Sequence, residues 1–406
     1  MNESISEHLM FGSAGLHVSH LLRLAQNLVQ IPSLTGMETE AAQFLCRYWQ
    51  GMGLPVEVQA VGLPNGGQIS HQTIARWRGK QPGPKILLCG HLDVMEVYRP
   101  DRWSHPPYEA FISDGWLYGL GSLNMKAGLA ALVSSVETLW RCNFPLRGEL
   151  VIAAVMGEII GGLGIRHLLE QEGDFDMALV AEPTNLNLVT ISVGTVQGWL
   201  RLWGDTLYFN PHANPIYAMS RVLDAFGPPY EPLSPEGWMT FEPCADLPNF
   251  PRFNARTLAS GQDHCEIFFD ARIVPTQNDD TLRDDLAALW QRLEPDLPGI
   301  RAELVVPATP GGVNFPAIPA MLVEHPLAKA LIRHHTEQRG QPPAIGAGDR
   351  LGLASDASHL RAAGIYTLEY GPGQHPRWPM WDERIAVGDV VTATKVFIET
   401  LVELGG

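Results

Sequence analysis

The chain has 406 residues, of which 45% are hydrophobic and 18% charged, a composition typical of globular proteins with well-buried cores. This length exceeds that of one ordinary domain and favours two. The formal net charge of −16 argues against nucleic acids and anionic membranes as partners, because nothing offsets the repulsion from phosphate. No apolar run approaches the roughly 20 residues of a membrane-spanning helix.

The start of the chain and its cysteines predict a cytoplasmic protein. The opening residues, Met-Asn-Glu-Ser-Ile-Ser-Glu-His, lack the basic and then apolar segments of a secretory signal. The cysteines are scattered, odd in number and include no Cys-x-x-Cys pair. Reduced thiols in a cytoplasm are the simplest explanation of that pattern.

Hydrophobic periodicity predicts alternating helices and strands in the first half of the chain. Apolar stripes indicate amphipathic helices, and short apolar runs indicate buried strands. Strands that alternate with helices predict a largely parallel sheet covered on both faces. The predicted helices are residues 21–30, 38–52, 125–139 and 165–170, and the predicted strands are residues 56–61, 73–77, 85–89, 149–156 and 178–181.

The pattern changes after Gly194, where we predict an inserted domain. Half-exposed strands and amphipathic helices in β-α-β-β-α-β order fit the size expected of a second domain. The sheet domain then resumes and closes with a helix. The predicted strands of the insert are residues 197–204, 265–273 and 301–306, its predicted helices are 215–226 and 280–293, and the closing helix is 387–404.

Two stretches carry the candidate chemistry. Gly90-His91-Leu92-Asp93 follows a buried strand, and on an extended chain His91 and Asp93 point the same way, at the carboxyl end where open α/β sheets place their sites. Further on, Asp114-Gly-Trp-Leu-Tyr-Gly-Leu-Gly-Ser-Leu-Asn-Met-Lys-Ala-Gly128 is a glycine-rich turn that opens an apolar helix. A His-x-Asp by itself is also typical of a capped strand end, but the two stretches together are far more specific.

With Trp103-Ser-His-Pro-Pro-Tyr108 between them, these stretches resemble the M20 family of zinc aminoacylases and peptidases over nearly the whole chain. That family holds two zinc ions across one bridging carboxylate, which generates a hydroxide and polarises an amide carbonyl. The resemblance assigns one ion to His91, to the position of Asn124 and to Glu182. It assigns the other ion to the positions of Asn124, Ile159 and Pro379.

Three of these positions depart from the family pattern. Asn124 stands where the family has the bridging aspartate, Ile159 where it has a glutamate and Pro379 where it has a histidine. Isoleucine and proline cannot bind a metal, and a neutral amide oxygen is a poor substitute for a carboxylate. The resemblance therefore implies no metal, or one weakly bound zinc on His91 and Glu182, and not a two-zinc centre. His375 is a candidate replacement ligand, with surface decoration as the alternative.

Other family positions are kept or altered in ways that concern catalysis and substrate. The resemblance makes Glu158 the general base and Asp93 the residue that orients His91. Without a neighbouring cation, the pKa of Glu158 should rise toward the range of an acid–base catalyst. Tyr208 replaces the lid histidine that stabilises the oxyanion, either as a hydrogen-bond donor or as filler of a vacated pocket. Arg272 matches the lid arginine that grips a substrate carboxylate, with a surface salt bridge as its alternative.

These inferences predict an α/β fold: a mostly parallel sheet flanked by helices, zinc-exopeptidase-like, with an inserted α+β ferredoxin-like lid. We expect a catalytic-type domain in residues 1–195 and 307–406, and a lid in residues 196–306 that the resemblance also makes the homodimer interface. The expected partner is a small carboxylate substrate held by Arg272, Tyr208 and Asn124, with no nucleic acid and no membrane.

Three functions remain open from the sequence. The first is a divergent enzyme that acts on an amide or acyl group of an amino-acid-like molecule, including metal-independent acyl transfer, condensation or cyclisation in a biosynthetic pathway. The second is a one-metal amide hydrolase, and the third is a non-catalytic relative that binds a ligand or partner. Retention of Glu158, Asp93, His91 and Glu182 favours an enzyme.

Overall fold

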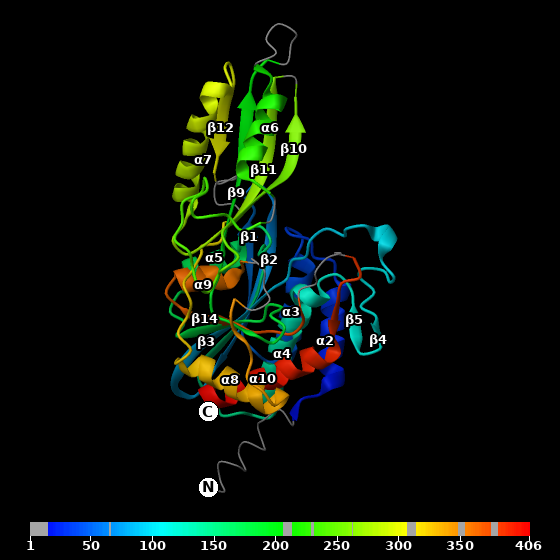
Figure 1. Cartoon of the computed structure of the whole chain (residues 1–406). Coiled ribbons are helices and arrows are strands. Elements are labelled where there is room, and N and C mark those ends of the chain that lie inside the picture. The colour runs from blue at the N-terminus through cyan, green and yellow to red at the C-terminus, as the bar shows by residue number, and fades with distance from the viewer. Residues whose placement is uncertain are drawn as a thin grey trace. The chain divides into compact units, whose positions relative to one another are not determined.

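The computed structural model describes residues 15–64, 66–205, 213–228, 231–261, 263–306, 314–347, 354–374 and 381–406. These residues form two compact units (Figure 1). Unit 1 consists of the described parts of residues 1–191, 320–351 and 355–406, and unit 2 of the described parts of residues 192–319 and 352–354.

Unit 1 is built on a mixed sheet whose centre is parallel, as the sequence predicted. Its described strands are β1 (Val56–Gly62), β2 (Ile69–Arg78), β3 (Gln81–His91), β6 (Arg147–Val155), β7 (Met177–Val180), β8 (Leu188–Val189), β13 (Ile345–Gly346) and β14 (Tyr366–Glu369). They lie in the order β1-β2-β6-β3-β7-β14-β8-β13. The run from β6 to β14 is parallel, and antiparallel pairs join β1 to β2, β2 to β6 and β14 to β8.

Helices cover both faces of this sheet (Figure 1). One face packs against α2 (Val18–Gln30), α3 (Thr39–Met52), α4 (Ala127–Arg141), α8 (Pro326–Arg339) and α10 (Val387–Gly405), and the other against α5 (Leu163–Gln171) and α9 (Asp356–Ala362). In β3, Ile86 and Leu88 belong to the first core, whereas Leu87 and Cys89 belong to the core under α5 and α9. This central strand therefore reads as an unbroken apolar run, as expected for a strand buried on both faces.

Unit 2 has the ferredoxin-like order that the sequence predicted. Its elements are β9 (Gly194–Trp203), α6 (Pro215–Phe226), β10 (Arg252–Ser260), β11 (His264–Ile273), α7 (Asp279–Leu293) and β12 (Arg301–Val305). The strands form an antiparallel sheet in the order β10-β11-β9-β12, with α6 and α7 packed along it (Figure 1). Asn278 starts α7 by accepting a hydrogen bond from the backbone N–H of Thr281, as an N-cap does. The unit has its own hydrophobic core.

Shorter elements complete unit 1 around the glycine-rich turn. A small sheet joins β4 (Ile112–Ser113), β5 (Trp116–Tyr118) and β15 (Arg384–Ala386), and one helical turn, η3 (Ser122–Lys126), leads into α4. Single 3-10 turns lie at Pro100–Arg102 in unit 1 and at Glu294–Asp296 in unit 2. Among the described residues, no helix is both long enough and apolar enough to cross a membrane.

Candidate active site

The carboxyl end of β3 delivers the first two site residues. His91 ends the strand and Asp93 follows it, and both side chains are fully buried. The Nδ1 atom of His91 lies 2.9 Å from the carbonyl oxygen of Asp93 and 3.3 Å from its Oδ1. Two acceptors on that side mean that Nδ1 carries a proton and donates it. The predicted pairing of these two residues is present in the structure.

Asp93 also ties together the loops around the site. Its Oδ1 accepts a hydrogen bond from the backbone N–H of Glu158 at 3.1 Å, and its Oδ2 accepts from the N–H of Ile159 at 3.1 Å and the hydroxyl of Thr35 at 3.0 Å. Burial works to raise the pKa of Asp93, but the hydrogen bond and charge of His91 and the two amides outweigh it and hold that pKa below its ordinary value. Asp93 is thus an ionised anchor that positions both His91 and Glu158.

The other nitrogen of His91 faces the altered position 124. The Oδ1 of Asn124 lies 3.1 Å from Nε2 of His91. Burial works against the charged imidazole, but the hydrogen bond with Asp93 and the charges of Glu158, Asp93 and Glu182 raise the pKa of His91 well above its ordinary value. Both ring nitrogens are therefore engaged by oxygen atoms of neighbouring side chains or backbone.

Glu158 lies on the loop after β6, where a second buried carboxylate holds the backbone. The N–H of Gly157 donates to Oε1 of Glu38 at 3.2 Å, and Ser70 donates to the other oxygen of Glu38 at 2.5 Å. The Oε2 of Glu158 is 4.0 Å from Nε2 of His91. Burial raises the pKa of Glu158 well above its ordinary value, and the carboxyls nearby add to that rise although His91 opposes it. This direction is the one expected for an acid–base catalyst.

Two further buried carboxyls lie close to His91 and Glu158. Glu182 follows β7, Asp356 begins α9, and each is 1% exposed. Burial raises the pKa of the Cys89 thiol, and the charges of Asp356, Glu182 and Glu158 raise it further, which puts all three carboxyls close to the strand that carries His91. Neither carboxyl oxygen of Asp356 has a hydrogen-bond partner within the described residues. Sequence reasoning missed Asp356, whose only signal was a Ser-Asp pair, typical of a helix start.

A buried lysine from the glycine-rich turn was also missed. The Nζ of Lys126 donates to the carbonyl oxygen of Ile31 at 2.7 Å. Burial lowers the pKa of Lys126 to about 7, although the charges of Glu383 and Asp93 oppose the change. Near neutral pH the Lys126 side chain is therefore present both as the charged ammonium and as the neutral amine, in the buried region that also holds Asp93 and Glu383.

The remaining predicted residues belong to unit 2 or lie outside the described residues. Arg272 belongs to unit 2, where its guanidinium donates to both oxygens of Asp270, at 2.8 and 3.2 Å, and to the hydroxyl of Thr195 at 2.9 Å. Asp270 is buried, so this pair fixes the Arg272 guanidinium within unit 2. Tyr208, His375 and Pro379 lie outside the described residues.

The donors for a metal are few in this arrangement. His91 and Glu182 occupy two family ligand positions, whereas Asn124 offers only an amide and Ile159 no donor. Within the described part of the chain, no three His, Cys, Asp or Glu side chains are grouped so that they could hold one ion.

A mostly parallel sheet flanked by helices is consistent with the zinc-exopeptidase fold. The sequence profile of peptidase family M20/M25/M40 matches residues 87–403, and the chain belongs to the M20 family.

Curated relatives and solved structures agree with this assignment. The chain is 23% identical over 415 residues to N-formyl-4-amino-5-aminomethyl-2-methylpyrimidine deformylase of Bacillus subtilis, covering 95% of each chain. It is 24% identical over 404 residues to succinyl-diaminopimelate desuccinylase of Hydrogenovibrio crunogenus, covering 95% of this chain and 99% of that one. An M20 family metallo-carboxypeptidase from Sulfolobus solfataricus superposes with a TM-score of 0.76 at 16% identity, over 95% of this chain and 98% of the other.

Proposed function

We propose that this protein is an M20-type enzyme that acts on an amide or acyl group of a small, carboxylate-bearing, amino-acid-like substrate without the two-zinc centre of its family. One observation carries the proposal: the amide of Asn124 lies 3.1 Å from Nε2 of His91, the nitrogen that the family resemblance assigns to a metal. The amide of Asn124 is neutral, so the group that faces Nε2 lacks the negative charge with which a bridging carboxylate holds two metal ions.

The chemistry of the donor set supports the same conclusion. A two-metal centre requires a carboxylate between its ions, and Asn124 is neutral where that carboxylate should be. Ile159 removes a second ligand, and its backbone N–H is instead bound to Asp93. The described residues therefore do not fit a pair of zinc ions, and we derive no catalytic step through a metal.

The roles that remain are those of the chain's own side chains. Glu158, buried and with a raised pKa, takes a proton from the attacking group and returns it to the departing nitrogen or oxygen. His91, held by Asp93, presents a fixed dipole or charge 4.0 Å from the Glu158 carboxyl. Tyr208 and Arg272 are proposed to bind the substrate, with Asp270 fixing the plane of the Arg272 guanidinium.

The N-acyl substrates named for the relatives suggest where to look for activity. One of them is named for removing a formyl group from an N-formyl compound, and the other for removing a succinyl group. We therefore propose N-formyl, N-acetyl and N-succinyl derivatives of small amines and amino acids as the first substrates. Both removal of the acyl group and its transfer to an amine should be assayed.

One-metal amide hydrolysis is the second candidate. The observation that favours it is the buried carboxyl of Asp356, close to His91 and Glu182, with no hydrogen-bond partner within the described residues. A rotation of that side chain toward Glu182 would add a third ligand. A non-catalytic binding role remains the third, and it predicts that no acyl substrate is turned over.

Metal content and activity, measured on the same sample, separate these functions. We expect protein purified without chelator to contain fewer than two zinc ions per chain by elemental analysis, and to keep its acyl activity in EDTA. Glu158→Gln should reduce that activity by about 100-fold or more, the usual contribution of a general acid–base. Two bound zinc ions, or activity lost in EDTA and restored by zinc, would overturn the proposal.

A reversion variant supplies the matched control. Asn124→Asp, Ile159→Glu and Pro379→His together restore the family's donors, so this variant should take up two zinc ions under the same purification. If the reverted protein and the natural protein contain equal amounts of zinc, the three altered positions do not decide metal binding.

A further inference from the structure

The turn that carries Asn124 does not satisfy its own backbone. It runs from Gly119 through η3, with Gly121 in the left-handed region at a φ of 81°. A Cβ atom on Gly121 would lie 2.5 Å from Cγ1 of Val94, so the backbone must approach that side chain closely. In this tight conformation several N–H groups point away from the turn, and buried N–H groups need acceptors from elsewhere.

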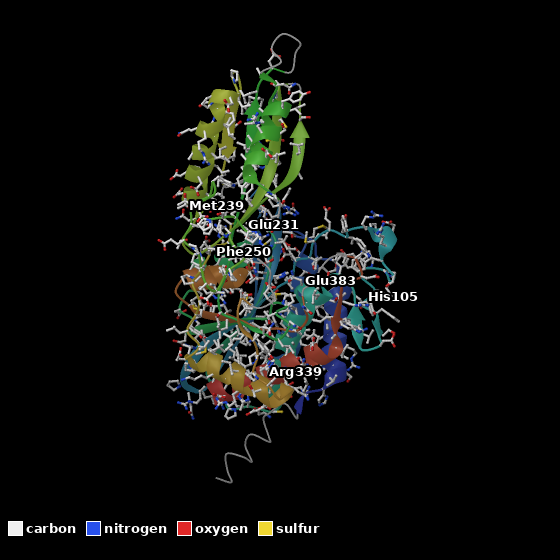
Figure 2. All side chains as sticks on the ribbon, in the orientation of Figure 1. His105, Glu231, Met239, Phe250, Arg339 and Glu383 are labelled. Carbon is white, nitrogen blue, oxygen red and sulfur yellow. The ribbon has the colours of Figure 1, made fainter. Side chains whose placement is uncertain are left out.

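One distant carboxylate accepts from three of these groups. The Oε2 of Glu383 accepts from the N–H of Gly121 at 3.0 Å, and its Oε1 accepts from those of Leu123 at 2.9 Å and Asn124 at 3.1 Å. The carbonyl oxygen of Glu383 also accepts from the N–H of Gly119 at 2.9 Å. Figure 2 shows Glu383 beside the ribbon that leads into α4.

Glu383 is itself held in place. The next residues form β15, whose pairing with β5 fixes the backbone on the other side of the turn. Lys126 lies near enough for its charge to favour the ionised carboxylate. Burial raises the pKa of Glu383, and the three amides and Lys126 act against that rise. Both ends of the turn are thus connected to one side chain and its own strand.

We propose that Glu383 is a positioning residue of the active site, which fixes Asn124 so that its amide meets Nε2 of His91. One of the three donors is the backbone N–H of Asn124 itself, and the side chain of that residue makes the 3.1 Å contact with His91. Asp93 holds the opposite ring nitrogen. The imidazole is therefore clamped between Asp93 on one side and the Asn124–Glu383 pair on the other. This inference rests on the proposed function only in taking His91 and Asn124 as parts of the site.

The test compares Glu383→Ala and Glu383→Gln with a matched control in the full chain. Glutamine keeps the oxygen for Leu123 and Asn124 but presents an amide to Gly121, so its effects should fall between those of alanine and the natural residue. Asp285→Asn is the control, because Asp285 is a largely buried carboxylate of unit 2 that accepts a hydrogen bond from the backbone N–H of Thr240 at 2.8 Å. All three variants should lower the melting temperature.

The deciding readout is the pair of ring-nitrogen resonances of His91 in protein labelled with ¹⁵N-histidine, assigned with His91→Gln. We expect them to shift strongly in Glu383→Ala, less in Glu383→Gln and not at all in Asp285→Asn. Unchanged His91 resonances in a folded Glu383 variant would overturn the proposal, and Glu383→Gln serves if the alanine variant does not fold. This spectrum decides the matter even if no acyl substrate is found.

Kinetics provide the second readout where activity is measurable. Substitution of a residue that orients a functional side chain typically lowers activity by about 10- to 100-fold. For Glu383→Ala we expect a loss of that size in kcat, with KM little changed. An equal loss in kcat for Asp285→Asn would assign the effect to stability alone and contradict a positioning role.

Discussion

The surroundings of single residues set their charge in this protein, and two histidines show opposite effects. The pKa of His91 is raised and that of His359 is lowered. His91 lies among carboxyls that favour its protonated form, whereas burial and the charge of Arg166 disfavour the protonated form of His359 on α9. The Nε2 atom of His359 donates to the carbonyl oxygen of Gly161 at 3.0 Å, on the loop that carries Glu158. The same side chain type is therefore used as a charged group at the site and as a neutral support beside it.

The neutral support predicts an acid-sensitive stability. Burial, with a smaller contribution from the charge of Arg166, lowers the pKa of His359 from 6.5 to about 4. Between these pH values His359 is protonated in the unfolded chain but remains neutral in the folded chain. The free energy of unfolding should therefore fall as the pH falls from about 6.5 to about 4. The loss should approach about 3 kcal/mol, at 1.36 kcal/mol for each pH unit.

Urea unfolding at a series of pH values measures this effect. His359→Gln keeps a donor for Gly161 but does not titrate, so it should be less dependent on pH over that window while other carboxyl groups still contribute. Parallel curves for the two proteins would show that His359 titrates in the folded state as it does in the unfolded chain.

At the scale of elements, the sequence predicted the helices and strands that have a clear hydrophobic periodicity. The helix expected at residues 215–226 is α6 with the same bounds, and His91 and Asp93 were expected to point the same way at the end of β3. The strand β10 was not predicted, because most of it is exposed and its residues do not alternate. The short helix α9 was also missed, since seven residues carry little periodic signal.

The parts of the site that could not be predicted depend on contacts between distant segments. Asp356 reaches the site only because α9 packs over the same sheet face as α5. The spacing of Glu383 matched the family pattern, yet its role follows from three hydrogen bonds to a turn about 260 residues earlier in the chain. No local pattern encodes such partners.

Close packing of α4 on the sheet predicts that an added methyl group at Gly128 destabilises the protein. A Cβ atom on Gly128 would lie 2.1 Å from the carbonyl oxygen of Ala181, the residue before Glu182. Gly128→Ala should therefore destabilise the protein by about 1–3 kcal/mol or more despite the better helix propensity of alanine, because backbone must move to admit the methyl group. Urea unfolding measures the loss.

Gly51 in α3 is the matched control for that substitution. A Cβ atom there meets nothing within 4 Å, so Gly51→Ala should leave stability unchanged or raise it by about 0.5–1 kcal/mol. If both variants were equally stable, the contact between α4 and the end of β7 would be less rigid than its geometry implies.

At the scale of the whole molecule, the two units have separate cores, and their stabilities should respond separately. The core of unit 2 centres on aromatic rings, with Phe253 and Phe269 stacked at 4.9 Å between ring centroids. Leu88 is fully buried in the core of unit 1. No residue appears in both core clusters, so a cavity in one should not remove contacts from the other.

Hydrogen exchange measured by mass spectrometry tests this separation on the full chain. Phe269→Ala should cost about 3–5 kcal/mol, since it removes a fully buried aromatic ring. Because local opening reports local stability, amides of β9, β10 and β11 should then exchange faster while those of β3, β6 and β7 keep their natural rates. Leu88→Ala should produce the reverse pattern at a cost of about 2–5 kcal/mol. Faster exchange in β3 and β11 alike, in either variant, would mean that the chain unfolds as one cooperative unit, and that changes in unit 2 reach the ends of the strands that carry His91 and Glu158.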